Sequence, residues 1–182
     1  MYSCMQLWFQ IKRACPELAK VTNSEKIYEI ILNHDLGETH EGDVSMTRQI
    51  KGESMNKKLT ERDEIVNITS KLKPEVQSEI LKNFDDFEAD LDNVLDVDIL
   101  VCKFIDALQG DQFALTFGND LPEHSELINK IINKRFVPYA SKLITTLKEK
   151  GHQTASEEIT TLANYHLSQI REASIKIDEI LF

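Results

Sequence analysis

The chain has 182 residues, of which 41% are hydrophobic, and this is enough for one domain with a sizeable core. Its formal net charge of −10 disfavours nucleic acid and acidic membrane surfaces as partners. No apolar run approaches the roughly 20 residues of a membrane span, and no secretion signal is visible, so we expect a cytoplasmic protein. The three cysteines lack Cys-x-x-Cys spacing and are expected to be reduced and mostly buried.

Long segments of the chain repeat with helical period, while only 6 glycines and 4 prolines occur, so the sequence predicts an all-α fold. Helices are predicted at about 1–15, 24–34, 57–72, 74–90, 96–116, 122–149 and 155–181. We expect Pro16 to end the first helix, Ser24 to cap the second and Pro138 to kink or break the sixth. One domain is expected over residues 1–182, with a core at about 1–117 and C-terminal helices at about 122–182.

The most informative stretch is His34-Asp35-Leu36-Gly37-Glu38, which is followed by Gly42-Asp43. It places a histidine and several carboxylates at the end of a helix that buries an apolar face. That face is predicted from Ile27, Ile30 and Ile31, with Tyr28 and Leu32. Glu38 follows His34 by four residues and is expected on the same side of the helix, where it could hold a water molecule or hydrogen-bond a ligand.

The glycines of this stretch predict a sharp change of direction that brings Asp43 back toward His34. Residues 44–55 then lack an apolar period and are predicted to form a loop or a lid. Arg48 and Lys51 in this loop are nearby cations that could contact a phosphate group. Two structural alternatives stay open: the loop is a solvated linker, and the histidine only favours the negative end of a helix dipole.

Asp106 is the second anomaly, because it stands inside the nearly continuous apolar run from Ile99 to Leu108. An ionised carboxylate there is costly unless it is paired or bound to a cation. A salt bridge with Lys103, one turn earlier, and a metal-binding role are both consistent with this position. Two further aspartates, Asp96 and Asp98, lie near the start of the same helix, where capping explains them.

Taken together, these residues resemble the pattern of the HD-domain phosphohydrolases. The matching elements are His34-Asp35, Glu38, Gly42-Asp43 and Val101-x-Lys103-x-x-Asp106-x-Leu108. Within that superfamily they most resemble the 5′-deoxynucleotidase branch, and Phe136-Val137-Pro138 is similar to a later helix of that branch. The similarity runs from the N-terminus to about Phe117.

The resemblance implies an HD-domain helical bundle that binds a divalent metal ion, such as manganese, cobalt or nickel. It implies that His34, Asp35 and Asp106 are metal ligands. It also implies that Glu38 orients or deprotonates the attacking water and that Asp43 protonates the leaving nucleoside oxygen. The expected activity is phosphate release from (deoxy)nucleoside 5′-monophosphates, and the expected assembly is a homodimer. The last helix with Phe113, Phe117 and Phe136 could provide apolar surface for a dimer, although burial in the core is the simpler account of these residues.

Two alternatives accompany this expectation. One is a nucleoside triphosphate hydrolase of the same superfamily, and the other is a non-catalytic nucleotide-sensing or dimerisation module with a degenerate metal site. The family's first metal-ligand histidine has no counterpart, since no histidine precedes His34. We expect that the natural protein starts upstream, because Met1 begins in mid-pattern without a capping residue; a genuine short form with an impaired site is the alternative.

Overall fold

A computed structural model of the chain describes residues 2–38, 57–117 and 132–180. Every element in these ranges is helical, which confirms the predicted all-α fold. In chain order the elements are α1 (Tyr2–Ala14), α2 (Pro16–Lys20), α3 (Ser24–Asn33), η1 (Leu36–Glu38), α5 (Lys57–Ile68), α6 (Pro74–Phe87), η2 (Leu91–Asn93), α7 (Val97–Phe117), η4 (Ile132–Phe136), α9 (Val137–Glu149) and α10 (Gln153–Ile180). In these ranges, no helix has both the length and the apolar character that crossing a membrane requires.

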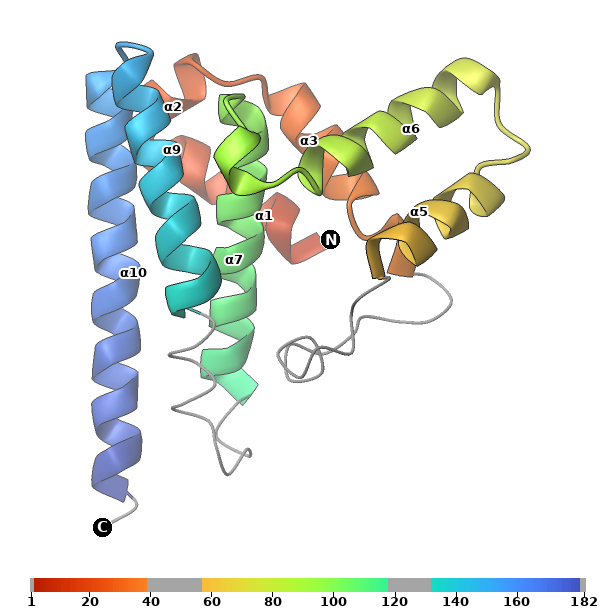
Figure 1. Ribbon diagram of the computed structural model, residues 1–182. Coiled ribbons are helices and arrows are strands. Elements are labelled where there is room, and N and C mark those ends of the chain that lie inside the picture. Colours follow the sequence, from red (N-terminus) through yellow and green to blue (C-terminus); the bar gives the residue numbers. More distant parts are fainter. Residues whose placement is uncertain (1, 39–56, 118–131, 181–182) are drawn as a thin grey trace.

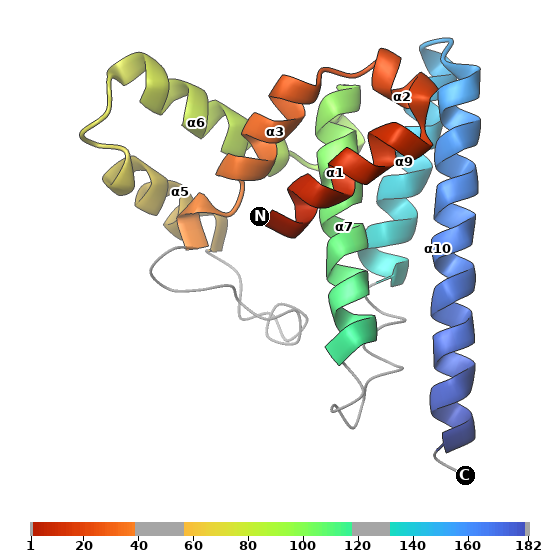
Figure 2. The same ribbon diagram turned by 180° about the vertical axis from the view of Figure 1, so that it is seen from behind.

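The central helix is α7, against which α1, α3 and α9 pack. Figures 1 and 2 show α9 and α10 on one side of α7, α3 on the other side, and α1 crossing it. Residues 99–105 of α7 are all buried. A helix that is apolar on all sides is typical of the centre of a bundle, so the apolar run around Asp106 reflects this central position.

The junction between α1 and α2 shows how Pro16 acts. The first helix ends at Ala14, as predicted, and Pro16 then begins a new short helix instead of a loop. The carboxylate of Glu158 in α10 accepts hydrogen bonds from the backbone N–H groups of Glu17 at 3.1 Å and Leu18 at 2.9 Å. A side chain distant in the sequence therefore caps α2 and ties it to the last helix.

The turn between α9 and α10 depends on a glycine. Gly151 has a φ of 81°, which a residue with a side chain adopts only at a cost. Its N–H group donates to the carbonyl of Lys148 at 2.9 Å, and the N–H group of His152 donates to that of Leu147 at 2.8 Å. These two hydrogen bonds end α9, and the turn at Gly151 lets α10 pack against α9 in the opposite direction.

Two predicted helix boundaries need correction. The residue that caps α3 is Asn23 and not Ser24, because the side-chain oxygen of Asn23 accepts from the N–H groups of Glu25 at 3.0 Å and Lys26 at 3.3 Å. The predicted helix at 57–72 ends at Ile68. At Pro138, where a kink or break was expected, the helix type changes: the residue lies in the first turn of α9, which follows the π-helical turn η4 without interruption.

The packing of the predicted apolar residues is largely as expected. Ile27, Ile30 and Ile31 of α3 are buried, but Leu32 is exposed. Phe136 is fully buried, with its ring centroid 5.4 Å from that of Phe104, so it is not available to a partner subunit. The side chains of Phe113 and Phe117 lie outside the described residues, and the homodimer stays a prediction.

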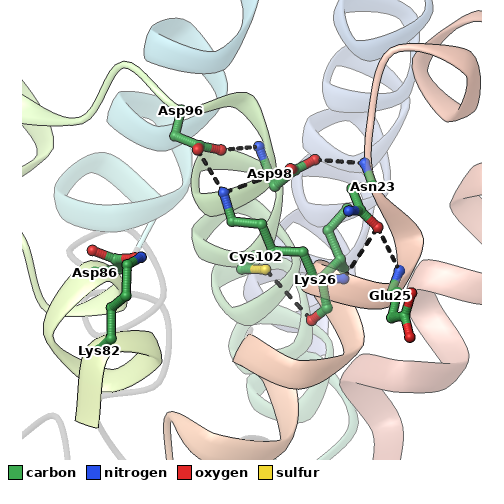
Figure 3. A network of polar contacts seen from close by, with 9 residues as sticks. Asn23, Glu25, Lys26, Lys82, Asp86, Asp96, Asp98 and Cys102 are labelled. Carbon is green, nitrogen blue, oxygen red and sulfur yellow. Dashed lines mark hydrogen bonds and ion pairs between the residues drawn. The ribbon is translucent and has the colours of Figure 1, made fainter. Parts of the chain in front are cut away.

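A polar network joins the N-terminal ends of α3 and α7 (Figure 3). The ammonium group of Lys26 lies 2.5 Å from a carboxylate oxygen of Asp96 and 3.7 Å from one of Asp98. Asp96 caps α7 by accepting from the N–H group of Asp98 at 2.9 Å, as predicted. Asp98 in turn accepts from the N–H group of Asn23 at 2.8 Å. These bonds hold the two helix starts side by side.

We expect Asp96→Asn to lower the free energy of unfolding at pH 7 by about 0.5 kcal/mol, because asparagine keeps the cap but loses the charge facing Lys26. Burial raises the pKa of Asp96, but the hydrogen bond and charge of Lys26 outweigh it and lower the pKa below 3.8. The carboxylate therefore stabilises the fold above pH 3.8 and loses this effect as the pH falls through its lower folded pKa. Urea unfolding at several pH values measures the difference between the two proteins, which should shrink below about pH 4.

The matched control is Asp92→Asn, which removes an exposed carboxylate from η2, the turn just before α7. This variant should unfold at the same urea concentration as the parent chain. An Asp96→Asn protein as stable as the control at pH 7 would contradict the role assigned to the network.

The turn after α3 is packed closely against α5. Gly37 is buried in η1, and a Cβ atom added to it would lie 2.6 Å from the carbonyl oxygen and 2.7 Å from the Cβ of Glu61. Both distances are shorter than side-chain carbon atoms tolerate, and one of the opposing atoms is backbone. Only glycine lets the turn that carries Asp35 and Glu38 approach α5 this closely.

Gly37→Ala should therefore lower the free energy of unfolding by about 1–3 kcal/mol through overpacking. Gly110→Ala in α7 is the matched comparison, because a Cβ there meets no atom within 4 Å. The free energy of unfolding of that variant should rise by about 0.5–1 kcal/mol, because alanine has a higher helix propensity than glycine. Thermal and urea unfolding of both proteins measure the two effects, and equal stabilities would show that η1 can move away from α5.

Candidate metal centre

The structure brings the three predicted metal ligands together where the end of α3 meets the middle of α7. His34 continues the hydrogen bonding of α3, since its N–H group donates to the carbonyl of Ile30 at 2.9 Å. Its Nε2 atom lies 3.1 Å from a carboxylate oxygen of Asp35 and 3.9 Å from one of Asp106. His34 and Asp35 thus share one site with Asp106, which lies 72 and 71 positions further along the sequence.

The orientation of the His34 ring is determined by its other nitrogen. Nδ1 lies 2.8 Å from the carbonyl oxygen of Ile31, and because a carbonyl only accepts, Nδ1 carries the hydrogen. This leaves Nε2 facing the two carboxylates. Nε2 is buried and forms no hydrogen bond, and the ring of Phe87 lies against the imidazole with its centroid 4.6 Å away. A buried polar atom without a hydrogen-bond partner is costly, so this atom points to a ligand.

The charges in the site favour the ionised carboxylate and the protonated imidazole. Burial alone lowers the pKa of His34, but the neighbouring carboxylates of Asp106 and Asp35 outweigh it and raise the pKa. Burial alone raises the pKa of Asp106, but His34, Arg135 and Lys103 outweigh it and lower the pKa. The carboxylates and the protonated imidazole therefore stabilise each other, and a metal ion that bound Nε2 would have to displace this proton.

Arg135 is the unexpected member of the site. Its Nη2 atom donates to the second carboxylate oxygen of Asp106. Asp106 is therefore paired, and this cation comes from η4, a segment that the sequence did not indicate. Lys103, one turn earlier in α7, also lowers the pKa of Asp106 by its charge, and its ammonium group lies 5.1 Å from the ring centroid of Phe87. One signal in the sequence could have indicated Arg135: a cation just before a helix N-terminus is unfavourable there unless an acidic group compensates it.

The chemistry of the donors fits a divalent transition metal, since one imidazole nitrogen and two carboxylates are ligands that such ions accept. Within residues 2–38, 57–117 and 132–180, however, no three His, Cys, Asp or Glu side chains are grouped so that they could hold a metal ion. The pair between Asp106 and Arg135 accounts for part of this, because it turns one oxygen of the carboxylate toward a cation of the protein itself.

Of the other predicted catalytic and substrate-binding residues, the structure describes only Glu38. Glu38 is half-buried at the end of η1, and its N–H group donates to the carbonyl of Asp35 at 3.1 Å. Asp43, Arg48 and Lys51 lie outside the described residues, so their assigned roles stay predictions. The chain leaves the α-helix before Asp35, so Glu38 reaches its position through a 3-10 turn and not by continuing α3.

The first helix also borders the site. Cys4 of α1 is buried, and burial together with the charges of Asp106 and Asp35 raises the pKa of its thiol to about 12. The thiol is therefore protonated. All three cysteines are buried and free, as the sequence predicted.

A second buried polar pair lies further along α7. Asp111 and His166 are both buried, and a carboxylate oxygen of Asp111 lies 3.1 Å from Nε2 of the histidine. The other oxygen of Asp111 is buried without a hydrogen-bond partner. Burial raises the pKa of Asp111, while His166 and Arg135 act in the opposite direction. The sequence indicated only that His166 lies on a helix face, because its partner is 55 positions away.

Comparison with known families is consistent with this geometry. A family model described as HD domain matches residues 9–134. The matched region contains His34, Asp35 and Asp106 but stops before Arg135. Comparisons with curated proteins and with solved structures found no match. Since the match covers more than half of the 182 residues, the chain belongs to the HD-domain family, whose members are generally metal-dependent hydrolases that bind divalent ions.

Proposed function

We propose that this protein is a metal-dependent phosphohydrolase that releases phosphate from (deoxy)nucleoside 5′-monophosphates. One observation carries the proposal: the buried Nε2 atom of His34 forms no hydrogen bond and faces the carboxylates of Asp35 and Asp106 in a chain of the HD-domain family. The preference for monophosphates and for deoxynucleotides is supported by the resemblance of the His34 and Asp106 motifs to the 5′-deoxynucleotidase branch.

His34, Asp35 and Asp106 are the residues that would hold the divalent ion. When bound, such an ion acts as a Lewis acid that activates water and neutralises phosphate charge. The carbonyl of Ile31 holds the hydrogen on Nδ1 of His34, so Nε2 is the ring nitrogen that would bind the ion. Phe87 covers one side of the imidazole and limits the access of bulk water.

Two carboxylates divide the proton transfers in this proposal. Glu38 takes a proton from the attacking water as the new bond from oxygen to phosphorus forms. Asp43 gives a proton to the nucleoside oxygen as the old bond from phosphorus to that oxygen breaks. The products are inorganic phosphate and a nucleoside, and no oxidant or further reactant is needed.

One observation favours a second candidate, a non-catalytic nucleotide-binding module. Arg135 neutralises Asp106, and within the described residues no metal-binding group is complete. In such a module the basic side chain would replace the ion as the partner of Asp106. Metal content separates the two candidates, because the module would bind nucleotide in the absence of divalent ions.

The purified chain should release phosphate from deoxynucleoside 5′-monophosphates when manganese, cobalt or nickel is added, and a chelator should abolish the activity. Free phosphate is measured over time with monophosphate and triphosphate substrates in parallel. We expect faster release from monophosphates. Nucleotide binding without phosphate release, unaffected by the chelator, would favour the module and contradict the hydrolase.

Removal of a predicted ligand should reduce metal binding. Asp35→Asn and Asp106→Asn keep the side-chain shape but lose the negative charge, and each should weaken manganese binding at least about tenfold. Isothermal titration with manganese alone measures this without any substrate.

The matched control is Asp85→Asn on α6, which removes a carboxylate that pairs with Arg62 outside the site at 2.9 Å. The control should bind manganese like the parent chain. Equal manganese affinity of Asp35→Asn and the control would exclude Asp35 as a ligand.

A further inference from the structure

Arg135 stands next to the predicted metal ligands without being one of them. Its guanidinium donates to one oxygen of Asp106, and the other oxygen of the same carboxylate lies 3.9 Å from Nε2 of His34. A single carboxylate therefore separates the guanidinium from the imidazole. Arg135 is thus linked through Asp106 to the residues that would hold the ion.

The pair differs from an ordinary buried salt bridge because substrate can reach it. The side chain of Arg135 is 33% exposed and that of Asp106 is 20% exposed. Lys103, the other cation that lowers the pKa of Asp106, has only 6% of its surface exposed, and its ammonium group lies over the rings of Phe87 and Tyr139. Of these two cations, Arg135 is the one that presents charge to the solvent.

The chemistry of the site requires a cation of this kind. The chain carries a net charge of −10, and the site contains the carboxylates of Asp35 and Asp106, which repel a phosphate dianion. A guanidinium offers five N–H donors in a planar fork that matches two phosphate oxygens at once. Arg48 and Lys51 were expected in this role from the sequence, and they lie outside the described residues.

The surroundings hold the arginine in place. Arg135 belongs to η4, a π-helical turn of the kind that occurs frequently at functional sites. Asp106 fixes the guanidinium from one side, and the arginine is also close enough to Asp111 to act on its carboxylate. The next residue, Phe136, is fully buried and anchors the turn against α7.

We propose that Arg135 binds the phosphate group of the substrate, with Asp106 orienting its guanidinium. The inference rests on the proposed phosphohydrolase function and names the residue that recognises the substrate's phosphate. Arg135 acts in binding and not as a metal ligand, so its effects on phosphate binding and on metal binding are separable.

The test measures two affinities by isothermal titration on the full chain: manganese alone, and inorganic phosphate in the presence of saturating manganese. Arg135→Gln should weaken phosphate binding about 10- to 100-fold, the range expected for a charge-assisted bidentate contact. The same variant should bind manganese at least as tightly as the parent chain, because a competing cation has left Asp106. Arg135→Lys keeps the charge without the fork and should give an intermediate phosphate affinity.

Arg62→Gln is the matched control, since Arg62 also pairs with an aspartate, Asp85, through two hydrogen bonds but on the α5 and α6 surface. It should change neither affinity. The KM for a deoxynucleoside monophosphate should rise in Arg135→Gln in parallel with the loss of phosphate affinity.

The outcomes separate this inference from the proposed function. If the parent chain binds manganese and phosphate, and Arg135→Gln and Arg135→Lys bind phosphate as tightly as the parent, the inference is overturned while the hydrolase proposal stands. Loss of manganese binding together with phosphate binding in both variants would show a structural role and also overturn it. A parent chain that binds neither manganese nor phosphate would overturn both proposals.

Discussion

The contact between α3 and α7 is the constraint on which the site depends. His34 lies eight positions after Lys26, and Asp106 lies eight positions after Asp98. Each spacing corresponds to about 12 Å of helical rise. The ion pairs of Lys26 at one end of the contact therefore set the register that brings the imidazole opposite the carboxylate at the other end. Close to the Lys26 end, the thiol of Cys102 also lies 3.7 Å from the carbonyl oxygen of Ile27.

The site combines burial with opposing charges. A carboxylate in the middle of α7 is expensive in an apolar environment, and the structure compensates it with an imidazole on one oxygen and a guanidinium on the other. The elements that provide these groups come from both sides of α7. α3 brings His34, and η4 brings Arg135 from the segment that leads into the C-terminal helices. The centre is therefore formed by tertiary packing and not by one local motif.

The helical period of the apolar residues predicted the positions of the helices, because each helix buries one face at a repeat of 3.6 residues. It located α3, α6 and α7 to within a few residues, and it identified His34 and Asp106 as polar groups where apolar ones were expected. The predicted N-cap of α3, Ser24, was wrong by one residue. Asparagine and serine are nearly equivalent N-cap residues, and only the hydrogen bonds of Asn23 identify it as the cap. Asp43, Arg48 and Lys51 stay predictions, because the described residues do not include them.

The sequence by itself determined the helical class and the buried faces, because these follow from local spacing. It also marked Asp106 as anomalous through the cost of a charge in an apolar run, and the resemblance to a known family named the three candidate ligands. Only the tertiary structure decided the partners. Arg135 is 29 positions from Asp106, and His166 is 55 positions from Asp111. Such pairs form when packing brings distant helices together, and no local pattern encodes which cation will meet which carboxylate. The same packing turned a histidine and two aspartates of an HD-domain motif into one site beside an arginine.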